Sequence, residues 1–189
     1  MTRTPTASQT VGPYLHLGLT RMTFPDIAAD ATQGETIVIA GRVLDGEGQP
    51  IPDALLEFWQ ANAAGRYTHP EDTQDKPLDG GFLGFGRVPT DRDGQFSFTT
   101  VKPGSVPGPG NSLQAPHIVV CVFMRGMLRH LYTRIYFSDE AGNAADPVLG
   151  LIGDESRRPT LIAQREPGSN RYRWNLVMQG AEETVFFDC

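Results

Sequence analysis

The chain has few cysteines, no long apolar run and no apolar segment near its start. No stretch approaches the roughly 20 apolar residues that a membrane-spanning helix needs. The first residues lack the apolar core of a secretory signal. Cys121 and Cys189 provide no disulfide framework, and we expect both to be reduced thiols. Together these absences favour a cytoplasmic protein.

Basic residues are not concentrated anywhere, and the formal net charge is −6. This balance argues against nucleic acid and against membranes as partners. A length of 189 residues is enough for one domain with its own core, and 21 glycines and 15 prolines are typical of a compact, turn-rich protein. We therefore expect a single domain over residues 1–189, with a polar, proline-containing arm at residues 1–14.

Short β-branched and aromatic runs, separated by turn residues, dominate the chain. Thr36–Leu44 and Gln95–Val101 are examples, and the segment 45–52 between strands is dense in glycine and proline. Such a succession predicts an all-β protein, an antiparallel β-sandwich with long loops. No dinucleotide fingerprint, phosphate-binding loop or nucleophile elbow is present. The predicted strands are 36–44, 54–59, 87–90, 95–101, 117–125, 130–137, 160–165, 171–179 and 183–188.

A histidine opens one of these strands. His117 and Val119 are two residues apart, so their side chains point to the same face. Two histidines at these positions would form a metal chelate, but valine cannot bind a metal. The spacing alone leaves three readings open: half of a metal site, a lost site, or a strand that happens to begin with histidine.

Four stretches together decide the family. They are GRVLDGEGQPIPDALLEFWQANAAGRY (41–67), TDRDGQFSFTTVKPG (90–104), APHI (115–118) and LYTRIYF (131–137). The first two also occur in transthyretin-like β-sandwich modules. With the WQAN, KPG and PHI motifs and the TVFFD ending, the chain resembles the intradiol ring-cleaving dioxygenases over nearly its whole length. The resemblance implies the β-sandwich of that family.

The resemblance also implies a set of iron ligands. In the family a ferric ion is held by two tyrosinates and two histidines, a donor set that suits Fe(III). Tyr67 fills the first tyrosine position, whereas Val106 occupies the second. His117 fills the first histidine position, whereas Val119 occupies the second, and the family's preceding arginine falls near Gln114. With two of four ligands left, we expect a vestigial site that binds no metal.

A metal-free chain of this family is expected to work with a partner. The resemblance implies a homologous iron-bearing beta chain that holds the Fe³⁺, assembled with this chain into a higher-order alpha–beta oligomer around a small aromatic substrate. It further implies that the arm and one arginine line the shared pocket. The arginine would pair with the carboxylate of a carboxylated catechol, although strand arginines also form ordinary surface ion pairs. The positions concerned are Thr10, Gly12, Pro13, Tyr14 and Arg134.

Two other functions remain to be compared with this one. The chain could be a stand-alone transthyretin-like binding module without enzymatic role, or a self-sufficient enzyme with unusual ligands. The arm, the LYTRIYF strand and the C-terminal match favour the subunit over the binding module. Val106 and Val119 argue against the self-sufficient enzyme.

Overall fold

The computed structural model describes residues 4–28 and 33–188. The start of the predicted arm and Cys189 therefore lie outside the described residues, whereas Cys121 is buried within a strand. No helix in these two ranges is long and apolar enough to cross a membrane.

The described chain is built mainly from β-strands, as predicted. One α-helix, α1, precedes them, and short 3-10 helices lie in the connections. The strands are β1 (Thr36–Leu44), β2 (Leu55–Gln60), β3 (Phe85–Pro89), β4 (Gln95–Val101), β5 (Val106–Pro107), β6 (Leu113–Gln114), β7 (His117–Phe123), β8 (Leu131–Phe137), β9 (Ile162–Arg165), β10 (Arg171–Arg173) and β11 (Leu176–Val177). The helices are α1 (Tyr14–Leu19), η1 (Thr20–Met22), η2 (Pro109–Asn111), η3 (Ala141–Ala145), η4 (Leu149–Leu151) and η5 (Glu155–Leu161).

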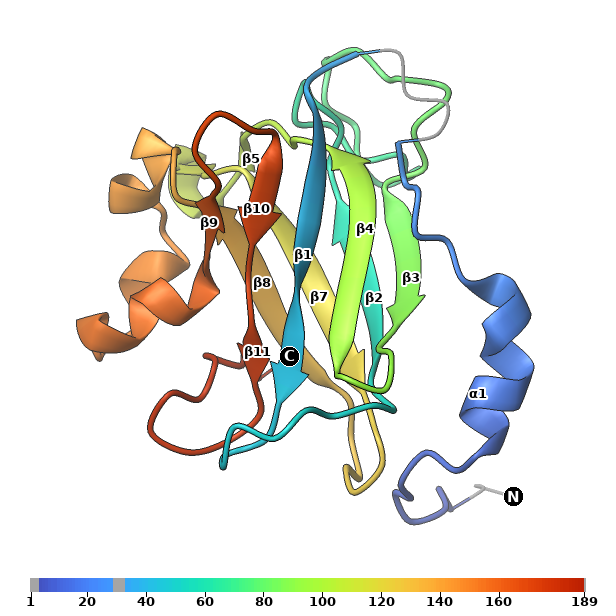
Figure 1. Ribbon diagram of the computed structural model, residues 1–189. Helices are drawn as coiled ribbons and strands as arrows, with labels where there is room; N and C mark the ends of the chain where they lie inside the picture. The colour runs from blue at the N-terminus through green and yellow to red at the C-terminus, as the bar shows by residue number, and fades with distance from the viewer. Residues whose placement is uncertain (1–3, 29–32, 189) are drawn as a thin grey trace.

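The main sheet is mixed. From β9 it runs through β8, β7 and β2 to β3, and in the other direction through β10 to β1, which also pairs with β11 and β4. Most neighbouring strands are antiparallel, but the pairs β1–β10, β1–β11 and β8–β9 are parallel, which corrects the wholly antiparallel expectation. Parallel neighbours need a long crossover, and the connection 138–161 with its 3-10 helices returns the chain from β8 to β9. Figure 1 shows β1, β4 and β10 lying across β2, β7 and β8.

A segment near the N-terminus joins the two end strands of this sheet. The backbone N–H of Phe24 donates to the carbonyl of Arg87 in β3 at 2.9 Å, and that of Ile27 donates to Thr99 in β4 at 2.8 Å. The Ile27 side chain is buried against Gly86, where an added Cβ would lie 2.4 Å from it. The sheet is thereby closed into a barrel-like shape.

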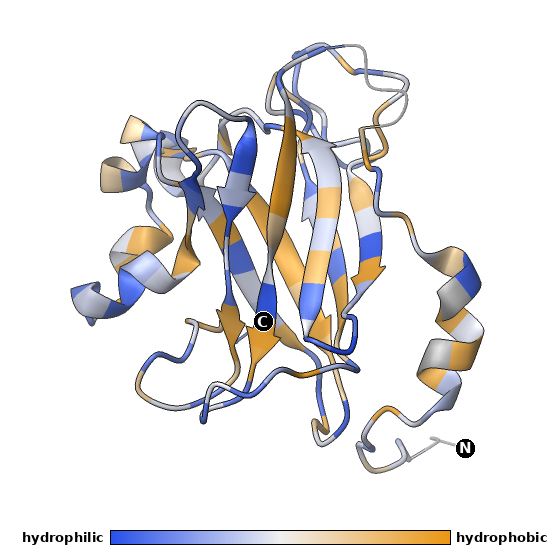
Figure 2. Cartoon of the chain, in the orientation of Figure 1, coloured by the Kyte–Doolittle hydropathy of each residue, from blue (hydrophilic) through white to orange (hydrophobic). Residues whose placement is uncertain are grey.

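The core fills the space between the two layers. Phe58 of β2 stacks on Phe98 of β4 with ring centroids 3.9 Å apart, and Phe96 meets the edge of Trp174. Figure 2 shows apolar residues gathered along the strands, whereas the connecting loops are mostly polar. A second cluster, around Tyr136, is covered by η4 and η5. Burial alternates most clearly along β3 and β4, which therefore have one buried and one outward face.

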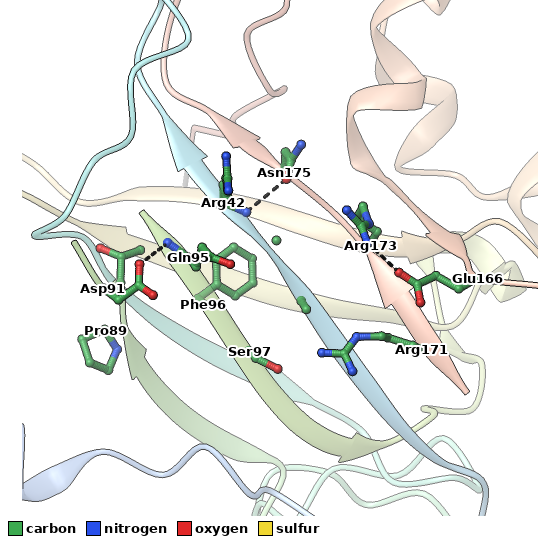
Figure 3. A pocket seen from close by; sticks show the side chains of 13 residues that line it. Arg42, Pro89, Asp91, Gln95, Phe96, Ser97, Glu166, Arg171, Arg173 and Asn175 are labelled. Atoms are coloured by element: carbon green, nitrogen blue, oxygen red, sulfur yellow. Dashed lines mark hydrogen bonds and ion pairs between the residues drawn. The ribbon is translucent and has the colours of Figure 1, made fainter. Parts of the chain in front are cut away.

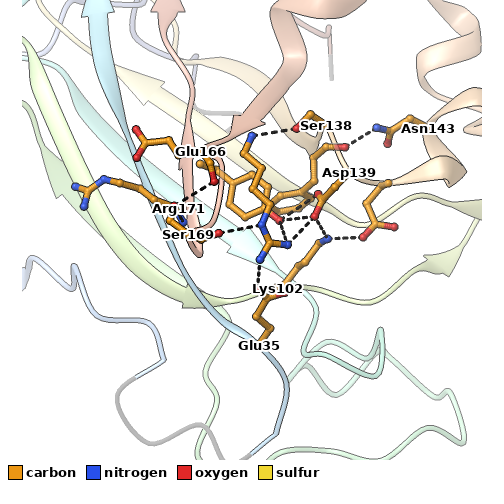
Figure 4. Close-up of polar contacts among 12 residues, drawn as sticks. Glu35, Lys102, Ser138, Asp139, Asn143, Glu166, Ser169 and Arg171 are labelled. Carbon is orange, nitrogen blue, oxygen red and sulfur yellow. Dashed lines mark hydrogen bonds and ion pairs between the residues drawn. The ribbon is translucent and has the colours of Figure 1, made fainter.

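The carboxylate of Asp139 forms hydrogen bonds and ion pairs with residues at the ends of several strands. Asp139, which follows β8, accepts hydrogen bonds from Arg165 at 2.8 Å, from the Tyr172 hydroxyl at 2.9 Å and from Lys102 at 3.1 Å. Arg165 also pairs with Glu35, just before β1 (Figure 4). Burial raises the pKa of Asp139, but the hydrogen bonds from Arg165, Tyr172 and Lys102 outweigh it and hold this pKa at about 2. Asp139 is therefore ionised at neutral pH and links β1, β4, β8, β9 and β10.

The parallel pairing of β1 requires a glycine at position 41. A Cβ there would lie 1.6 Å from the Trp174 carbonyl oxygen, which is backbone and cannot move aside. We expect Gly41→Ala to lower the free energy of unfolding by about 3 kcal/mol, as overpacking of a well-packed core does. Urea denaturation measures this change. Gly153→Ala is the matched control, because nothing lies within 4 Å of the added carbon. Equal stabilities of the two variants would contradict the requirement.

Candidate functional site

A row of side chains crosses three neighbouring strands on the outward face. Trp59 of β2 pairs with Val119 of β7, and Val119 pairs with Arg134 of β8. The intervening residues Ile118 and Ile135 are fully buried in the core. Because side chains alternate along a strand, Trp59, Val119 and Arg134 must point the other way, away from the core.

A hollow of about 690 Å³ opens over this row. The loops 61–84 and 102–116 form its other walls. All four positions of the predicted ligand set lie in its lining, together with Arg134 and with Gln114, where the family's arginine falls. The ligand positions that the structure brings together are Tyr67, Val106, His117 and Val119.

The WQAN and KPG motifs hold the two loops together. The Asn62 side chain accepts a hydrogen bond from the backbone of Arg66 at 3.0 Å and donates to the Pro77 carbonyl at 2.9 Å. The backbone carbonyl of Asn62 accepts a hydrogen bond from the N–H of Gly104 at 2.9 Å. A Cβ at Gly104 would lie 2.5 Å from the Ala63 carbonyl oxygen, so the loops approach this closely only with glycine there. These contacts place Tyr67 and Val106 in one hollow.

Tyr67 is held at the wall of the hollow as a neutral phenol. Its backbone N–H donates to Asp72 at 2.7 Å, and its ring stacks on Trp59 with centroids 5.8 Å apart. Burial raises the pKa of the hydroxyl, Arg134 opposes this, and Asp72 adds to it, with a net rise. The hydroxyl therefore keeps its proton at neutral pH.

His117 is buried and neutral. Its Nδ1 lies 2.8 Å from the Ala115 carbonyl oxygen. A carbonyl only accepts hydrogen bonds, so Nδ1 carries the proton of the neutral ring. Burial and the positive charge of Arg134 lower the pKa of His117 from 6.5 to about 4, against smaller opposing effects of the Ala115 carbonyl and Asp146.

Arg134 is anchored through one of its three nitrogens. Nη1 donates to the Gln114 side-chain oxygen at 2.7 Å and to the Tyr136 hydroxyl at 3.3 Å, and that hydroxyl donates to Asp146 at 3.2 Å. The guanidinium also lies 5.9 Å from the centre of the Phe187 ring. Among the residues that the structure describes, no acidic side chain forms an ion pair with Arg134. Within the described residues, Arg134 therefore has no acidic partner for the ordinary surface ion pair that was the alternative interpretation.

Comparisons with known proteins agree with this geometry. A family model described as a dioxygenase matches residues 12–180. The alpha chains of protocatechuate 3,4-dioxygenase from Burkholderia cepacia and Pseudomonas putida are 46% and 43% identical to this chain, each over 97% of it and 96% of the relative. The chain belongs to the intradiol dioxygenase family. This confirms the predicted family and favours it over the transthyretin-like module.

Two further comparisons place the chain within the intradiol dioxygenases. The beta chain of the Burkholderia cepacia enzyme is 39% identical over 80% of this chain and 67% of its own length. The dioxygenase domain of a carbohydrate-binding fusion protein from Streptomyces sp. SirexAA-E has a TM-score of 0.63 at 25% identity, covering 84% of this chain and 89% of the other. The all-β fold of the family is therefore present here.

The residues present do not fit the ferric ion of the intradiol dioxygenases. Val106 and Val119 supply apolar surface in the hollow where oxygen and nitrogen donors are needed. Within residues 4–28 and 33–188, no group of three or more His, Cys, Asp or Glu side chains could hold a metal. One phenol and one imidazole are too few for this metal, so we derive no step through iron in this chain.

The predicted arm residues lie outside the hollow. Thr10, Gly12, Pro13 and Tyr14 are absent from its lining. The Thr10 hydroxyl accepts the N–H of Gly126 in the β7–β8 turn at 2.9 Å. Tyr14 begins α1 and is 83% exposed. Figure 1 shows α1 standing beside β3, clear of the sheet. The structure thus brings together Arg134 and the four ligand positions, but not the arm.

A second hollow, of about 760 Å³, lies on the outward face of β4, β1 and β10 (Figure 3). Arg42, Arg171 and Arg173 line it, and Arg173 pairs with Glu166 at 2.9 Å. Sequence reasoning missed this cluster. The alternation of two arginines around the buried Tyr172 was the available signal, but the third arginine joins them only through the pairing of β1 with β10.

The depressed pKa of His117 predicts a pH dependence of stability. Between about pH 6.5 and pH 4 the unfolded chain takes up a proton that the folded chain does not, so stability falls as the pH is lowered through this range. The full shift corresponds to roughly 3 kcal/mol. In His117→Asn, which keeps an N–H donor but cannot titrate, this part of the pH dependence should disappear. Urea denaturation at several pH values compares the two chains, and parallel curves would contradict a neutral, buried imidazole.

Proposed function

We propose that this chain is the metal-free alpha subunit of an enzyme that cleaves protocatechuate. With an iron-bearing beta chain it converts protocatechuate and O₂ to 3-carboxy-cis,cis-muconate, and both oxygen atoms enter the product. The observation that carries the proposal is the pair of valines, Val106 and Val119, in the same hollow as Tyr67 and His117, the two retained positions of the predicted ligand set. Similarity to two alpha chains over 97% of this chain supports it.

In this proposal the two chains have different roles. The beta chain holds the Fe³⁺, which supplies the activation of the catechol toward O₂. This chain has no activity alone, and it assembles with the beta chain into a higher-order alpha–beta oligomer in the cytoplasm. The similarity of this chain to a beta chain supports such an arrangement of related subunits around a shared pocket.

The N-terminal arm is the part of this chain that we assign to the partner's pocket. Tyr14 is 83% exposed and Leu17 is 73% exposed, and apolar side chains gathered on an exposed segment mark an interaction surface. Gly12 lets backbone approach a ligand closely, and Pro13 stiffens the arm. We propose that Thr10, Gly12, Pro13 and Tyr14 line the pocket of the beta chain. Arg134 lines the hollow of this chain, and its pairing with the substrate carboxylate stays a prediction.

Iron content and the visible spectrum test the proposed division. Tyrosinate bound to Fe(III) absorbs strongly in the visible range. We expect this chain, purified alone, to be colourless, free of iron and inactive, and the complex with a co-expressed beta chain to be coloured and active with one iron per alpha–beta pair. One iron per isolated chain would contradict the metal-free assignment. A colourless chain that does not join the beta chain would contradict the subunit assignment.

A substitution at Gly12 tests the role of the arm. Within this chain nothing lies within 4 Å of a Cβ added at Gly12, so Gly12→Val should leave its stability unchanged. In the complex, the added methyl groups should raise KM for protocatechuate roughly tenfold, the equivalent of a 1.4 kcal/mol clash. Steady-state kinetics measure this, with Gly153→Ala, also in open space, as the control. An unchanged KM would contradict the proposal that the arm lines the pocket of the beta chain.

A further inference from the structure

We propose that the second hollow, on the outward face of β4, β1 and β10, is a binding site for a small polycarboxylate. Its volume of about 760 Å³ lies within the range of about 300–1,000 Å³ that is usual for small-molecule sites. None of the residues that line it also lines the hollow around Arg134. The site therefore lies outside the pocket with which the proposed function is concerned.

The floor of this hollow is the small side chain of Ala40 in β1. Ile39 is fully buried in the core, so the next residue, Ala40, points outward. In the sheet register Ala40 lies between Ser97 of β4 and Arg173 of β10. Because alanine carries only a methyl group, a ligand can approach the sheet between the longer side chains that surround it.

Three arginines surround this floor. Arg173 is the direct neighbour of Ala40, Arg171 lies two residues before Arg173 on the same face, and Arg42 lies two residues beyond Ala40. From the usual spacings within and between strands, the three arginine Cα atoms lie within about 8 Å of the Ala40 Cα, a distance that an arginine side chain can span. In Figure 3 the Arg171 side chain extends across β1 toward Ser97. All three guanidinium groups can therefore reach an anion that lies above Ala40.

Two of these arginines carry a charge that the chain itself does not compensate. Within the part of the chain that the structure describes, the side chains of Arg42 and Arg171 form no ion pair. Arg173 already binds one carboxylate, because its Nη2 lies 2.9 Å from Glu166. On a chain whose formal net charge is −6, two uncompensated guanidinium groups beside each other favour an anionic ligand.

Other polar groups of the hollow add hydrogen-bond donors. The Asn175 side-chain oxygen accepts the backbone N–H of Arg42 at 3.0 Å, so its Nδ2 remains a donor, and Ser97 contributes a hydroxyl. Asp91 also lines the hollow, but its Oδ1 is used by the backbone N–H groups of Asp93 and Gln95 at 2.9 and 2.8 Å. The hollow thus offers donors at several separate points around one small floor.

Separate guanidinium groups favour a ligand with more than one carboxylate. One carboxylate can occupy the paired donors of only one guanidinium, so a ligand that uses Arg42 and Arg171 together needs at least two. The product of the proposed reaction, 3-carboxy-cis,cis-muconate, has three carboxylates, whereas protocatechuate has one. We therefore expect the site to bind the product and not the substrate, an assignment that rests on the proposed function.

A series of three acids tests the site without reference to the reaction. Propane-1,2,3-tricarboxylate, glutarate and butyrate carry three, two and one carboxylates on similar short chains. In calorimetric titrations of the full-length chain at neutral pH, we expect one tricarboxylate to bind per chain, glutarate to bind more weakly, and butyrate to bind at least tenfold more weakly than the tricarboxylate. Equal affinity for the three acids, or equally tight binding of inorganic phosphate, would overturn the proposal.

Three variants and one control assign the binding to this hollow. Arg42→Gln and Arg171→Gln should each weaken binding of the tricarboxylate at least tenfold. Ala40→Val keeps every charge but fills the floor with a side chain that suits a strand, and should weaken binding to the same extent. Arg129→Gln removes the same charge from the β7–β8 turn, outside the lining of the hollow, and should change nothing. Urea denaturation confirms that each variant is folded.

The outcomes separate this proposal from the proposed function. Absence of saturable tricarboxylate binding, or binding that Arg129→Gln weakens as much as Arg171→Gln does, would overturn the site even if the chain forms an active complex with a beta chain. Selective binding that depends on Arg42 and Arg171 would establish the site even if the chain were to join no beta chain. In competition, 3-carboxy-cis,cis-muconate should displace the tricarboxylate and protocatechuate should not; equal displacement by both would overturn the assignment to the product.

Discussion

The pairing of β7 between β2 and β8 is the constraint on which both the core and the hollow depend. In this register Ile118 and Ile135 meet in the core, while Val119 and Arg134 meet on the outward face. A slip of one residue would exchange the two faces of a strand. Because burial of the two isoleucines sets the register, Arg134 can only point outward, in one row with Val119 and Trp59.

The loss of metal ligands did not require a new scaffold. Both valines lie on strands, where β-branched side chains are favoured. The loops of the hollow are held by Asn62 and Gly104 through hydrogen bonds and a close backbone contact, so a metal is not needed to keep them in place. This explains how the WQAN and KPG motifs accompany an incomplete ligand set: they organise the loops whether or not a metal is bound.

Local patterns predicted much of the fold but not its long-range pairing. The bounds of β1 and β4 agree with the prediction, because alternation is clear in both. The predicted strand 171–179 divides into β10 and β11, and 183–188 contributes only a bridge between Phe187 and Tyr132. The two-residue strands β5 and β6 and the six-residue α1 are too short to show a period. The positions that converge on the hollow followed from the family resemblance. The role of Asn62 and the second arginine cluster were not predicted, because both depend on contacts between residues that are far apart in the sequence.

The segment that closes the sheet makes the final shape of the chain depend on residues that are synthesised much later. Phe24 and Ile27 leave the ribosome early, yet their hydrogen-bond partners are Arg87 and Thr99, which are made much later. The segment can dock only after β3 and β4 exist, so its closure is a late step of folding. An unfinished chain therefore cannot hold this segment, or α1 and η1 that precede it, in their final places.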